Sequence, residues 1–515
     1  MKSAQPFVKM IDFYEKLETL GLNDILFEID YERPNFRGLP KVLSFLTEAI
    51  TSDKKVLIYG DYDVDGLMCN LTISEGLQNC GLQHYDIFQY HSRMHELDKI
   101  AVQQCLQGDY DYFVVGDTGF GESDLSKIRL LADADVKVVI LDHHNTLYAY
   151  EDLPENVAAI NTTVENVPAA LSLSAGALCF VVMDALAEKM NIKFKENLAA
   201  YATISLFADC MDMRSKLNRA IYFRARKLER EELPRKVKLF MNKYSAFNAR
   251  FIGFWFSPRI NAVFRCEHLQ LLNVLFLQKN IMVTTETETL EQINNVYEES
   301  RELVGKVVDI VDTTIMNHFV VANLNSVNNY INIKKNKLYN YTGLVANQLS
   351  DRYERTAVVI CLSDNFYKGS VRDLYGRNYL AIFRKICFAG GHNAAFGIRV
   401  GVFEKNNFIE SIHRIDQLFA IERIENKPII IDYEYNSIDP ALIEDIAMYN
   451  EFPGPSVPLV LLRKRIIGGI REEHSNYNFK YNWDGYTIQS NRRLDFGTKV
   501  LLKPIKSWKT KLLVQ

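Results

Sequence analysis

The sequence predicts an α/β protein in which a parallel-sheet domain is joined by a long helix to a second α/β domain, followed by a small β-barrel. Apolar runs at 56–59, 112–115 and 136–141 end in Gly, Asp or His, and the segments between them are long enough for crossover helices, as in βαβ units. The stretch from about Thr289 to His318 has helical periodicity. Residues 461–515 carry twelve Lys and Arg against four Asp and Glu, and alternate aromatic with polar residues, which favours a small basic β-structure.

The same patterns set the expected domain bounds. We expect a helical lead-in over 1–50, a first α/β domain over 51–288, a linking helix over 289–318, a second α/β domain over 319–421 and a barrel over 428–515. Runs at 319–322 and 356–360 indicate strands of the second domain. In the barrel, Asp484-Gly485 is a hairpin turn between strands at 477–483 and 486–488.

Composition excludes several classes of protein. The chain has 515 residues, 48% apolar and 24% charged, which is ordinary for a globular protein of about three to four domains. Its net charge is −4, so any nucleic-acid-binding surface must be local. We find no apolar run of about 18 residues and no signal peptide, so no membrane partner is expected. Eight cysteines without a C-x-x-C pair favour a reducing, cytoplasmic setting.

Acidic and histidine side chains follow the three strands of the first domain. Asp61, Asp63 and Asp65 come after the first run, Asp117 after the second and Asp142-His143-His144 after the third, while Asp209 follows a helix. Side chains at i and i+2 of an extended segment point the same way. Ligands of open α/β sheets bind outside the carboxyl ends of the strands. We therefore expect these side chains to converge.

Converging carboxylates favour a hard divalent cation. They repel one another unless a cation lies between them. Oxygen ligands with one or two imidazoles and no thiolate suit Mn²⁺ or Mg²⁺ better than Zn²⁺. A pair of such ions about 3.5–4 Å apart would serve phosphodiester hydrolysis. Gly60 and Gly66 flank the carboxylates and suit tight turns. A single Asp after a strand is usually a helix cap, but this reading does not account for the whole set.

At this point the sequence resembles a family. The segments Asp61 to Gly66, Asp117, Asp142 to His144 and Asp209 resemble the four motifs of the DHH phosphoesterases, and the nearest subgroup is the RecJ-like single-strand-specific exonucleases. Further segments are similar to that subgroup: Ser257 to Ala262 with Arg265, Thr342 to Ala346, Lys368 to Arg372, and Gly390-Gly391-His392. The resemblance runs from Val56 to Val400.

The resemblance implies a role for each matching residue. Five residues would be metal ligands, namely Asp63, Asp65, Asp117, His143 and Asp209. His144 would lie at the scissile phosphate, where it stabilises charge or assists proton transfer, and Asp142 would orient the histidines. Asp61 is expected either as a ligand or as a carboxylate just outside the ligand set.

The resemblance also implies where nucleic acid is held. Ser370, Arg372 and the turn Gly390-Gly391-His392 would hold its backbone, because Gly-Gly N–H groups can approach a phosphate and arginine can bind it bidentately. Arg259 and Arg265 belong to the same expected contact set. The basic 428–515 unit is similar in position and character to the OB-like nucleic-acid-binding barrel of the family. Half of its aromatic residues are expected in the barrel core.

The function expected from the residues and the resemblance together is a metal-dependent exonuclease that hydrolyses single-stranded DNA to mononucleotides. The 5′-to-3′ polarity comes from the resemblance alone. Single-stranded DNA is the expected partner, RNA stays open, and a single-strand-binding protein or a helicase is a candidate protein partner. A clamp of three domains can act as a monomer.

Two alternatives remain. Other DHH proteins are phosphodiesterases for short oligoribonucleotides or cyclic dinucleotides, but those chains are generally shorter and lack a C-terminal barrel. Some RecJ relatives bind single strands without cleaving them and have lost the metal ligands, which this sequence keeps. Comparing the cleavage of a long strand with that of a dinucleotide distinguishes the exonuclease from the first alternative. A chain that binds single strands with Mn²⁺ but never shortens them would be the second alternative.

Overall fold

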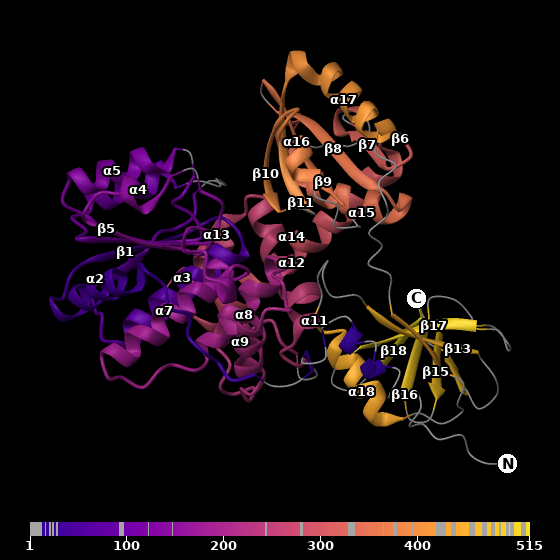
Figure 1. Ribbon diagram of the computed structural model, residues 1–515, viewed down its shortest axis with the longest axis horizontal. Coiled ribbons are helices and arrows are strands. Elements are labelled where there is room, and N and C mark those ends of the chain that lie inside the picture. Colours follow the sequence, from indigo (N-terminus) through magenta and orange to yellow (C-terminus); the bar gives the residue numbers. More distant parts are fainter. Residues whose placement is uncertain are drawn as a thin grey trace. The chain divides into compact units, whose positions relative to one another are not determined.

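The computed structural model (Figure 1) describes most of the chain. The described residues are 13–15, 17–19, 22, 25–26, 29–91, 97–121, 123–146, 148–242, 245–278, 282–327, 335–363, 365–373, 379–392, 395–418, 429–433, 439–452, 459–465, 471–474, 479–483, 486–490, 494, 499–505 and 511–514. The expected domain end at 421 and the turn Asp484-Gly485 lie outside them. No helix of the described residues is both long and apolar enough to cross a bilayer.

The chain forms two compact units. The first comprises Met1–Phe264, Leu269–Leu290 and Pro428–Gln515, and the second comprises Arg265–His268 and Glu291–Lys427. The expected barrel region therefore groups with the first α/β domain. The domain bounds given above stay predictions.

A five-stranded parallel sheet is the centre of the first unit. Its strands are β1 (Val56–Gly60), β2 (Tyr85–Ile87), β3 (Tyr112–Gly116), β4 (Lys137–Asp142) and β5 (Val157–Asn161), in the order β2-β1-β3-β4-β5. Every residue of β1 and β3 is buried, as expected for apolar strands covered on both faces. The three predicted strands and their parallel pairing are confirmed.

The strand order places the candidate site. Helices α2 (Leu39–Thr51), α3 (Val64–Asn79) and α7 (Ala175–Lys189) lie on one side of the sheet, and α4 (Lys99–Gln107) and α5 (Asp124–Asp133) lie on the other (Figure 1). The crossover direction reverses between β1 and β3, which are neighbours in the sheet. Such a switch point opens a crevice at the carboxyl ends of its two strands. Asp61 follows β1 and Asp117 follows β3.

Further helices complete this unit, and α8 (Leu198–Ala208) packs against α3 and α7. The short elements η1 (Tyr150–Asp152), α6 (Thr162–Glu165) and η2 (Pro168–Ala170) lie between β4 and α7 in the chain. The elements after α8 are α9 (Lys216–Arg226), α10 (Arg235–Lys238), α11 (Ala249–Phe251), η3 (Ile252–Phe256), α12 (Ser257–Arg265), α13 (Leu269–Leu272) and η4 (Asn273–Leu277).

The long helix α14 differs in its bounds from the predicted helix. It begins at Val283 rather than Thr289 and ends at Ile310 rather than His318. The β-branched residues Thr313 to Ile315 form strand β6 instead, paired with β7 (Phe319–Asn323). Cross-strand pairing thus outweighs the helical periodicity of these residues.

The second unit is built on a six-stranded sheet of order β10-β11-β9-β8-β7-β6. It adds β8 (Thr356–Ser363), β9 (Phe366–Arg372), β10 (Phe388–His392) and β11 (Ala395–Gly401), and only β7 and β8 pair in parallel among the described strands. Its helical elements are η5 (Leu324–Val327), η6 (Lys335–Tyr341), α15 (Thr342–Tyr353), α16 (Tyr379–Phe383), η7 (Val402–Glu404) and α17 (Lys405–Leu418). The expected second α/β domain is confirmed as a fold.

The C-terminal region is a seven-stranded mixed sheet with one helix, α18 (Pro440–Tyr449). Its strands are β12 (Ile429–Tyr433), β13 (Val460–Arg465), β14 (Arg471–His474), β15 (Phe479–Trp483), β16 (Tyr486–Ser490), β17 (Lys499–Ile505) and β18 (Lys511–Val514). The expected hairpin is present as β15 and β16. In the described residues the end strands β12 and β14 do not pair, so a closed OB-like barrel stays a prediction.

Buried polar and aromatic contacts tie this region to the rest of the first unit. The Tyr222 hydroxyl and the Arg226 guanidinium of α9 both donate to the Glu451 carboxylate. Phe452 packs edge-on against Tyr222, at 5.6 Å between ring centroids. A buried carboxylate is costly unless it is paired and hydrogen-bonded. The contact therefore sets a specific docking of the C-terminal sheet on α9.

Candidate metal centre

The loop after β1 presents three carboxylates. Asp63 is the N-cap of α3, and its side chain accepts a hydrogen bond from the Gly66 N–H at 3.0 Å. A Cβ atom on Gly66 would collide with the backbone of Asp61, and one on Gly60 would collide with the carbonyl of Gly66. The end of β1 thus lies directly against the first turn of α3. Neither glycine has a positive φ, so it is this close approach, and not the backbone conformation, that requires glycine at both positions.

Asp65 is held in place by hydrogen bonds from α7 and α8. Its carboxylate is fully buried and accepts hydrogen bonds from the N–H groups of Ala175 (2.9 Å) and Gly176 (2.8 Å). The Ser205 hydroxyl of α8 donates to the same carboxylate. The two N–H donors lie at the N-terminus of α7, where the helix dipole favours a negative charge.

Asp117 follows β3 in an unusual backbone conformation. Its φ is +66°, in the left-handed region that only Gly, Asn and Asp adopt readily. The residue is buried, and its Oδ1 accepts no hydrogen bond from any described residue. Such strain is found mostly at functional sites.

Asp142 shapes the turn that carries the two histidines. Its Oδ1 accepts hydrogen bonds from the N–H of His143 (2.7 Å), the N–H of His144 (3.2 Å) and the His144 ring Nδ1 (2.8 Å). From the end of β5, the Asn161 amide donates to the carbonyl of His144 at 2.9 Å, and the Thr163 hydroxyl donates to that of His143 at 3.1 Å. These hydrogen bonds fix the backbone of the turn and the direction of the His144 ring.

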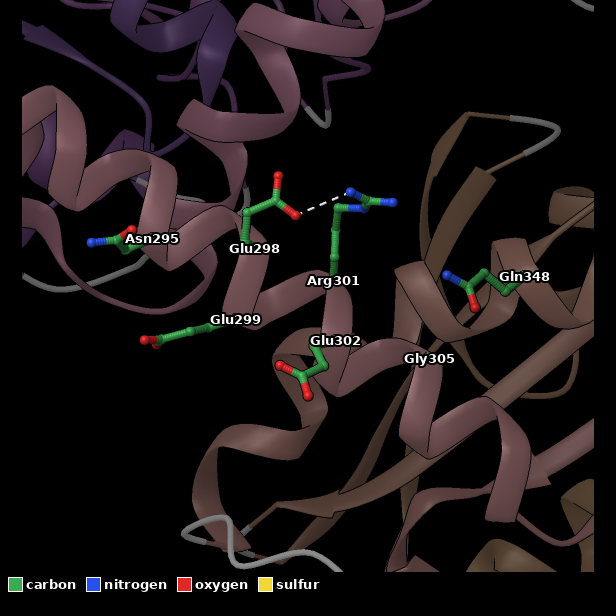
Figure 2. A pocket seen from close by; sticks show the side chains of 7 residues that line it. All are labelled: Asn295, Glu298, Glu299, Arg301, Glu302, Gly305 and Gln348. Carbon is green, nitrogen blue, oxygen red and sulfur yellow. Dashed lines mark hydrogen bonds and ion pairs between the residues drawn. The ribbon is translucent and has the colours of Figure 1, made fainter. Parts of the chain in front are cut away.

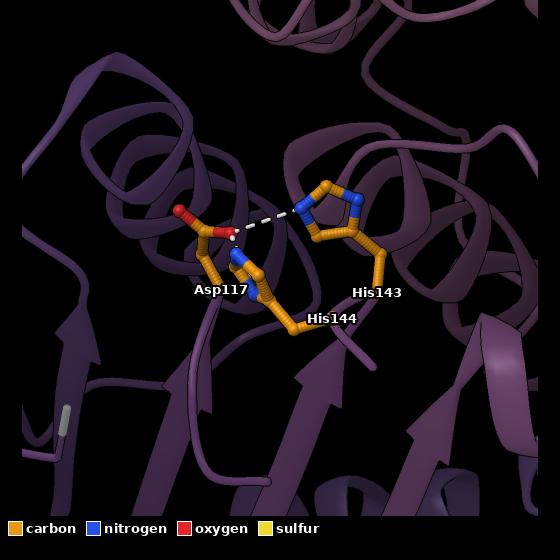
Figure 3. A group of neighbouring side chains, drawn as sticks. All are labelled: Asp117, His143 and His144. Carbon is orange, nitrogen blue, oxygen red and sulfur yellow. Dashed lines mark ion pairs between the residues drawn. The ribbon is translucent and has the colours of Figure 1, made fainter. Parts of the chain in front are cut away.

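These elements bring the side chains together at the carboxyl edge of the sheet. His143 Nε2 lies 3.3 Å from Asp117 Oδ1, 3.4 Å from Asp209 Oδ2 and 3.8 Å from Asp65 Oδ2. Both imidazole rings point towards the Asp117 carboxylate (Figure 3). The distances confirm that the carboxylates and imidazoles converge.

Three overlapping groups have the spacing of metal ligands. They are Asp117 with His143 and His144, Asp65 with His143 and Asp209, and Asp61 with Asp63 and Asp117. Within each group the potential ligand atoms all lie within 4.8 Å of one another. Asp117 and His143 each belong to two groups. The arrangement therefore accommodates more than one cation, with Asp117 and His143 between the positions.

The ionised forms of these buried carboxyl groups are disfavoured relative to their protonated forms. Burial and then the charge of Asp63 raise the pKa of Asp65 to about 6, although its three donors favour the ionised form. Burial, followed by the charges of Asp65 and Asp63, raises the pKa of Asp117 and that of Asp209 well above the ordinary value. Repulsion of this kind is relieved by a cation.

His144 differs from His143 in exposure and charge. Its side chain is 49% exposed, whereas that of His143 is 4% exposed. Burial acts to lower the pKa of His144, but Asp142 and neighbouring carboxylates outweigh it and raise this pKa to about 10. Burial likewise acts to raise the pKa of Asp142, but the two histidines hold it below its usual range. In the cation-free chain these carboxylates therefore favour the protonated form of the half-exposed His144 ring.

The donor set fits a hard divalent cation. It consists of carboxylate oxygens and imidazole nitrogens, and the nearby Cys210 belongs to none of the three groups. Asp117 Oδ1 and Asp142 Oδ2 are buried oxygens without a hydrogen bond from a described residue, and a buried carboxylate oxygen requires a partner. For Asp117, the partner that fits is a metal ion.

Comparison with known proteins assigns the fold that carries this centre. Residues 55–208 match the DHH family, N-terminal domain. The structure superposes on that of RecJ from Thermus thermophilus in complex with Mn²⁺, with a TM-score of 0.72 and 17% identity over 100% of this chain and 78% of that one. Residues 55–208 thus match a DHH domain, and the chain has the fold of RecJ.

Curated relatives support the same assignment. The single-stranded-DNA-specific exonuclease RecJ of Bacillus subtilis is 24% identical over 72% of this chain and 46% of its own length, so the chain spans about half of that relative. RecJ of Haemophilus influenzae is 21% identical over 74% of this chain and 69% of its own. A Thermus thermophilus RecJ structure with Mg²⁺ has a TM-score of 0.67 at 15% identity, over 99% of this chain and 77% of that one.

Some residues that support the DHH centre were not found from the sequence. Ser205, Ala175 and Gly176 hold Asp65, and a Cβ on Gly176 would lie 2.7 Å from Ser205 Oγ and 3.0 Å from Asp65 Oδ1. No spacing links α7 and α8 to Asp65, so no sequence signal identified them. Asn161 did carry a signal, because it is a polar residue at the carboxyl end of a buried strand, close to the position of Asp117 after β3.

We expect Ser205→Ala to weaken metal binding without unfolding the DHH domain. The substitution removes a donor that favours the ionised form of Asp65, so a proton competes better with the cation at that carboxylate. Loss of such a supporting partner typically weakens metal affinity by about 10–100-fold. Titration of Mn²⁺ by calorimetry measures the effect. Ser74→Ala, a buried serine of α3 bonded to the Leu71 carbonyl, is the control and should bind as the unmodified chain does.

Stabilisation of the DHH domain by Mn²⁺ should depend on pH. Carboxyls whose pKa is raised on folding, as that of Asp65 is to about 6, bind protons more tightly in the folded chain. The cation-free chain therefore loses stability as pH rises through that pKa, and a cation must displace protons at low pH. We expect the Mn²⁺-induced gain in Tm to be larger at about pH 7.5 than at about pH 5. A gain that is the same at both pH values would contradict this.

The second unit brings together most of the expected nucleic-acid contacts. One row across the sheet consists of Ser370, Gly397 and Gly390. Another row on the same face consists of Arg372, Ala395 and His392. They thus form two adjacent rows across β9, β11 and β10. The Thr342 hydroxyl of α15 is 2.9 Å from that of Ser370, and a Cβ on Gly343 would lie 2.8 Å from Arg372 Nη2. The expected turn Gly390-Gly391-His392 is part of strand β10 instead, where the pairing with β11 continues through His392 and Gly391 has a φ of +129°.

The two remaining arginines lie elsewhere. Arg259 is 4% exposed in the first unit, its guanidinium carbon lies 3.5 Å from the Trp255 ring centroid, and its Nη1 donates to the Trp255 carbonyl at 2.9 Å. Arg265 ends α12 in the second unit and acts on the pKa of Tyr341, just before α15. Their expected contacts with nucleic acid stay predictions.

An acidic hollow beside α14 is unsuited to a polyanion. It has a volume of about 600 Å³ and is lined by Asn295, Glu298, Glu299, Arg301, Glu302, Gly305 and Gln348. Figure 2 shows Arg301 paired with Glu298, and that ion pair is 3.1 Å long. The three carboxylates outnumber the single cation, so the hollow repels phosphate.

Proposed function

We propose that this chain is an exonuclease that hydrolyses single-stranded DNA in the 5′-to-3′ direction and releases mononucleotides, with Mn²⁺ or Mg²⁺ as its cofactor. The observation that carries the proposal is the set of three overlapping ligand groups at the carboxyl edge of the sheet. Asp117 belongs to two of these groups, and so does His143. The relatives that match the chain are named as single-stranded-DNA-specific exonucleases. Two of the matching structures contain Mn²⁺ and Mg²⁺.

Each residue has a distinct task in this proposal. Asp63, Asp65, Asp117, His143 and Asp209 hold a pair of cations, and Asp61 joins Asp63 and Asp117 in one group. Bound there, the cations supply the Lewis acidity that polarises a phosphodiester and activates water. His144 is half-exposed and Asp142 favours its protonated form, so this ring is suited to stabilise the charge that develops on the phosphate. Asp142 keeps that ring in place.

The C-terminal sheet supports a single-stranded substrate. One row of paired residues crosses four strands of this sheet and consists of Lys480, Gln489, Leu513 and Lys503. The two lysines therefore share one face of the sheet. Lys511 lies two residues from Leu513 on the same face. Burial lowers the pKa of Lys503 and of Lys511, and Arg250 lowers both further, which shows that these cations lie close together. Concentrated positive charge is what a phosphate backbone offsets.

A strand-polarity assay tests the proposal. Single strands labelled at the 5′ or the 3′ end are incubated with Mn²⁺, Mg²⁺ or chelator, beside a duplex and a dinucleotide. We expect mononucleotides from the 5′ end of the single strand only, and none with chelator. Asp63→Ala and His143→Ala should abolish cleavage and keep strand binding, while His84→Ala, an exposed histidine, should behave as the unmodified chain. Preference for the dinucleotide, or binding without shortening, would refute the proposal.

A further inference from the structure

Among the residues that the structure describes, one face of the second unit's sheet carries exposed side chains on β9, β11 and β10. Alternate residues of these strands, such as Val371, Phe396 and Ile398, point into the core beneath α16 and α17. The opposite face is covered by α15 at β8, where Val359 and Cys361 are buried, and also at the end of β9 that carries Ser370 and Arg372. Beyond β8, the same face carries exposed aromatic and basic side chains. The sheet therefore ends in an open surface next to the rows of Ser370 and Arg372.

Two phenylalanines and an arginine form the outer part of this surface. Phe388 is 60% exposed and Phe366 is 43% exposed, although both are large apolar residues. The Arg399 guanidinium carbon lies 4.8 Å from the Phe388 ring centroid and 5.3 Å from that of Phe366. We call these three residues the aromatic platform. Cation–π contacts hold the rings and the guanidinium in a fixed arrangement while leaving them exposed to solvent.

The platform adjoins a row in which two of the three residues are glycines. Phe388, Arg399 and Lys368 are opposite one another across the three strands, and the next row is Gly390, Gly397 and Ser370. A Cβ on Gly390 would meet no atom within 4 Å, and one on Gly397 would meet its nearest atoms only at 3.8 and 3.9 Å. Packing within the chain therefore does not require these glycines. A strand glycine of this kind marks a place where a ligand approaches the backbone closely.

The charge of the surface selects an anionic partner. The sequences of β9, β10 and β11 contain no Asp or Glu, whereas Lys368, Arg372 and Arg399 belong to this face. Lys368 Nζ lies 4.7 Å above the ring of Tyr339, which leaves its charge without a carboxylate in the described residues. Exposed aromatic rings interleaved with cations suit a chain that has both phosphates and flat bases.

We propose that the aromatic platform stacks nucleobases of single-stranded DNA while the glycine row admits the adjoining sugar–phosphate backbone. The inference rests on the proposed function for the identity of the polymer, and it adds a base-contacting subsite at Phe366, Phe388 and Arg399. Stacking tolerates any base, because every base has a π face. The subsite thus contributes affinity without sequence preference.

Fluorescence anisotropy of a labelled oligodeoxythymidylate, measured on the full chain in chelator, tests the platform. We expect Phe388→Ala and Phe366→Ala each to bind about tenfold more weakly, and Phe388→Tyr to bind as the unmodified chain does. Phe403→Ala is the matched control, because Phe403 is fully exposed on η7, outside the platform. On an abasic strand of the same length, the alanine variants and the unmodified chain should bind equally.

Three binding results would overturn the platform. The first is unchanged affinity of both alanine variants for the normal strand. The second is an equal loss of affinity on the normal and abasic strands. The third is an equal loss of affinity for Phe403→Ala. A change in self-association with unchanged strand affinity would make the surface a protein contact and would also refute the inference. Binding is measured in chelator and does not depend on cleavage. If the chain cleaves no strand in the strand-polarity assay but its alanine variants still lose affinity only for strands with bases, the exonuclease proposal alone is refuted.

Discussion

Asp117→Asn should abolish cleavage of single-stranded DNA, with a loss of at least about a thousandfold. Asp117 belongs to two of the three ligand groups, so the substitution removes a carboxylate charge that both cation positions share. Asparagine keeps the shape of the side chain and tolerates the φ of +66°. The chain should therefore fold, and steady-state cleavage with Mn²⁺ measures the loss.

The stability of the same variant should change in the opposite direction. Burial and neighbouring carboxylates raise the pKa of Asp117, so its ionised form is unfavourable in the cation-free chain. We expect Asp117→Asn to raise Tm in chelator by a few degrees and to reduce the gain from Mn²⁺. Asp109→Asn is the control, because Asp109 has φ +51° on the surface. An Asp117→Asn chain that cleaves normally would refute the assignment of Asp117.

Gly66→Ala should have the second largest effect, because it acts on the backbone of the site. Its Cβ would collide with the N and O atoms of Asp61, which are rigid main-chain atoms. The first turn of α3 would move away from β1, and Asp63 and Asp65 would move with it. We expect a loss of about 3 kcal/mol or more in the free energy of unfolding and no detectable cleavage. Denaturant unfolding and the strand assay measure the two effects.

Gly305→Ala is the matched control for that collision. Gly305 lies inside α14, and a Cβ there would meet no atom within 4 Å. Alanine should stabilise the helix by about 0.5–1 kcal/mol relative to glycine. If Gly66→Ala unfolded at the same denaturant concentration as the unmodified chain and cleaved normally, the close approach of β1 and α3 would not be required.

The sequence predicted the first sheet and the convergence of the carboxylates well. Strands β1 and β3 and the interior of β4 are apolar, and the carboxyl ends of parallel strands meet at one edge. Local pattern and known topology were enough to place Asp61, Asp117 and His143 near one another. The role expected for Gly60 and Gly66 was different, since a close approach of two elements leaves no local signal.

Other features depend on contacts that sequence periodicity does not contain. The three donors to Asp65 come from α7 and α8, more than a hundred residues further along the chain. The end of α14 depends on the pairing of β6 with β7. The grouping of the C-terminal sheet with the first unit accompanies the buried contact between Tyr222 and Glu451. Each depends on tertiary packing that only the fold supplies.

X-ray diffraction from crystals soaked in Mn²⁺, recorded at the manganese absorption edge, tests the metal centre most directly. We predict anomalous peaks about 2–2.5 Å from carboxylate oxygens of Asp117 and from His143 Nε2, and their loss in Asp117→Asn crystals. Well-occupied peaks only at other sites, or none in an active crystal, would contradict the assignment of these residues as the ligands.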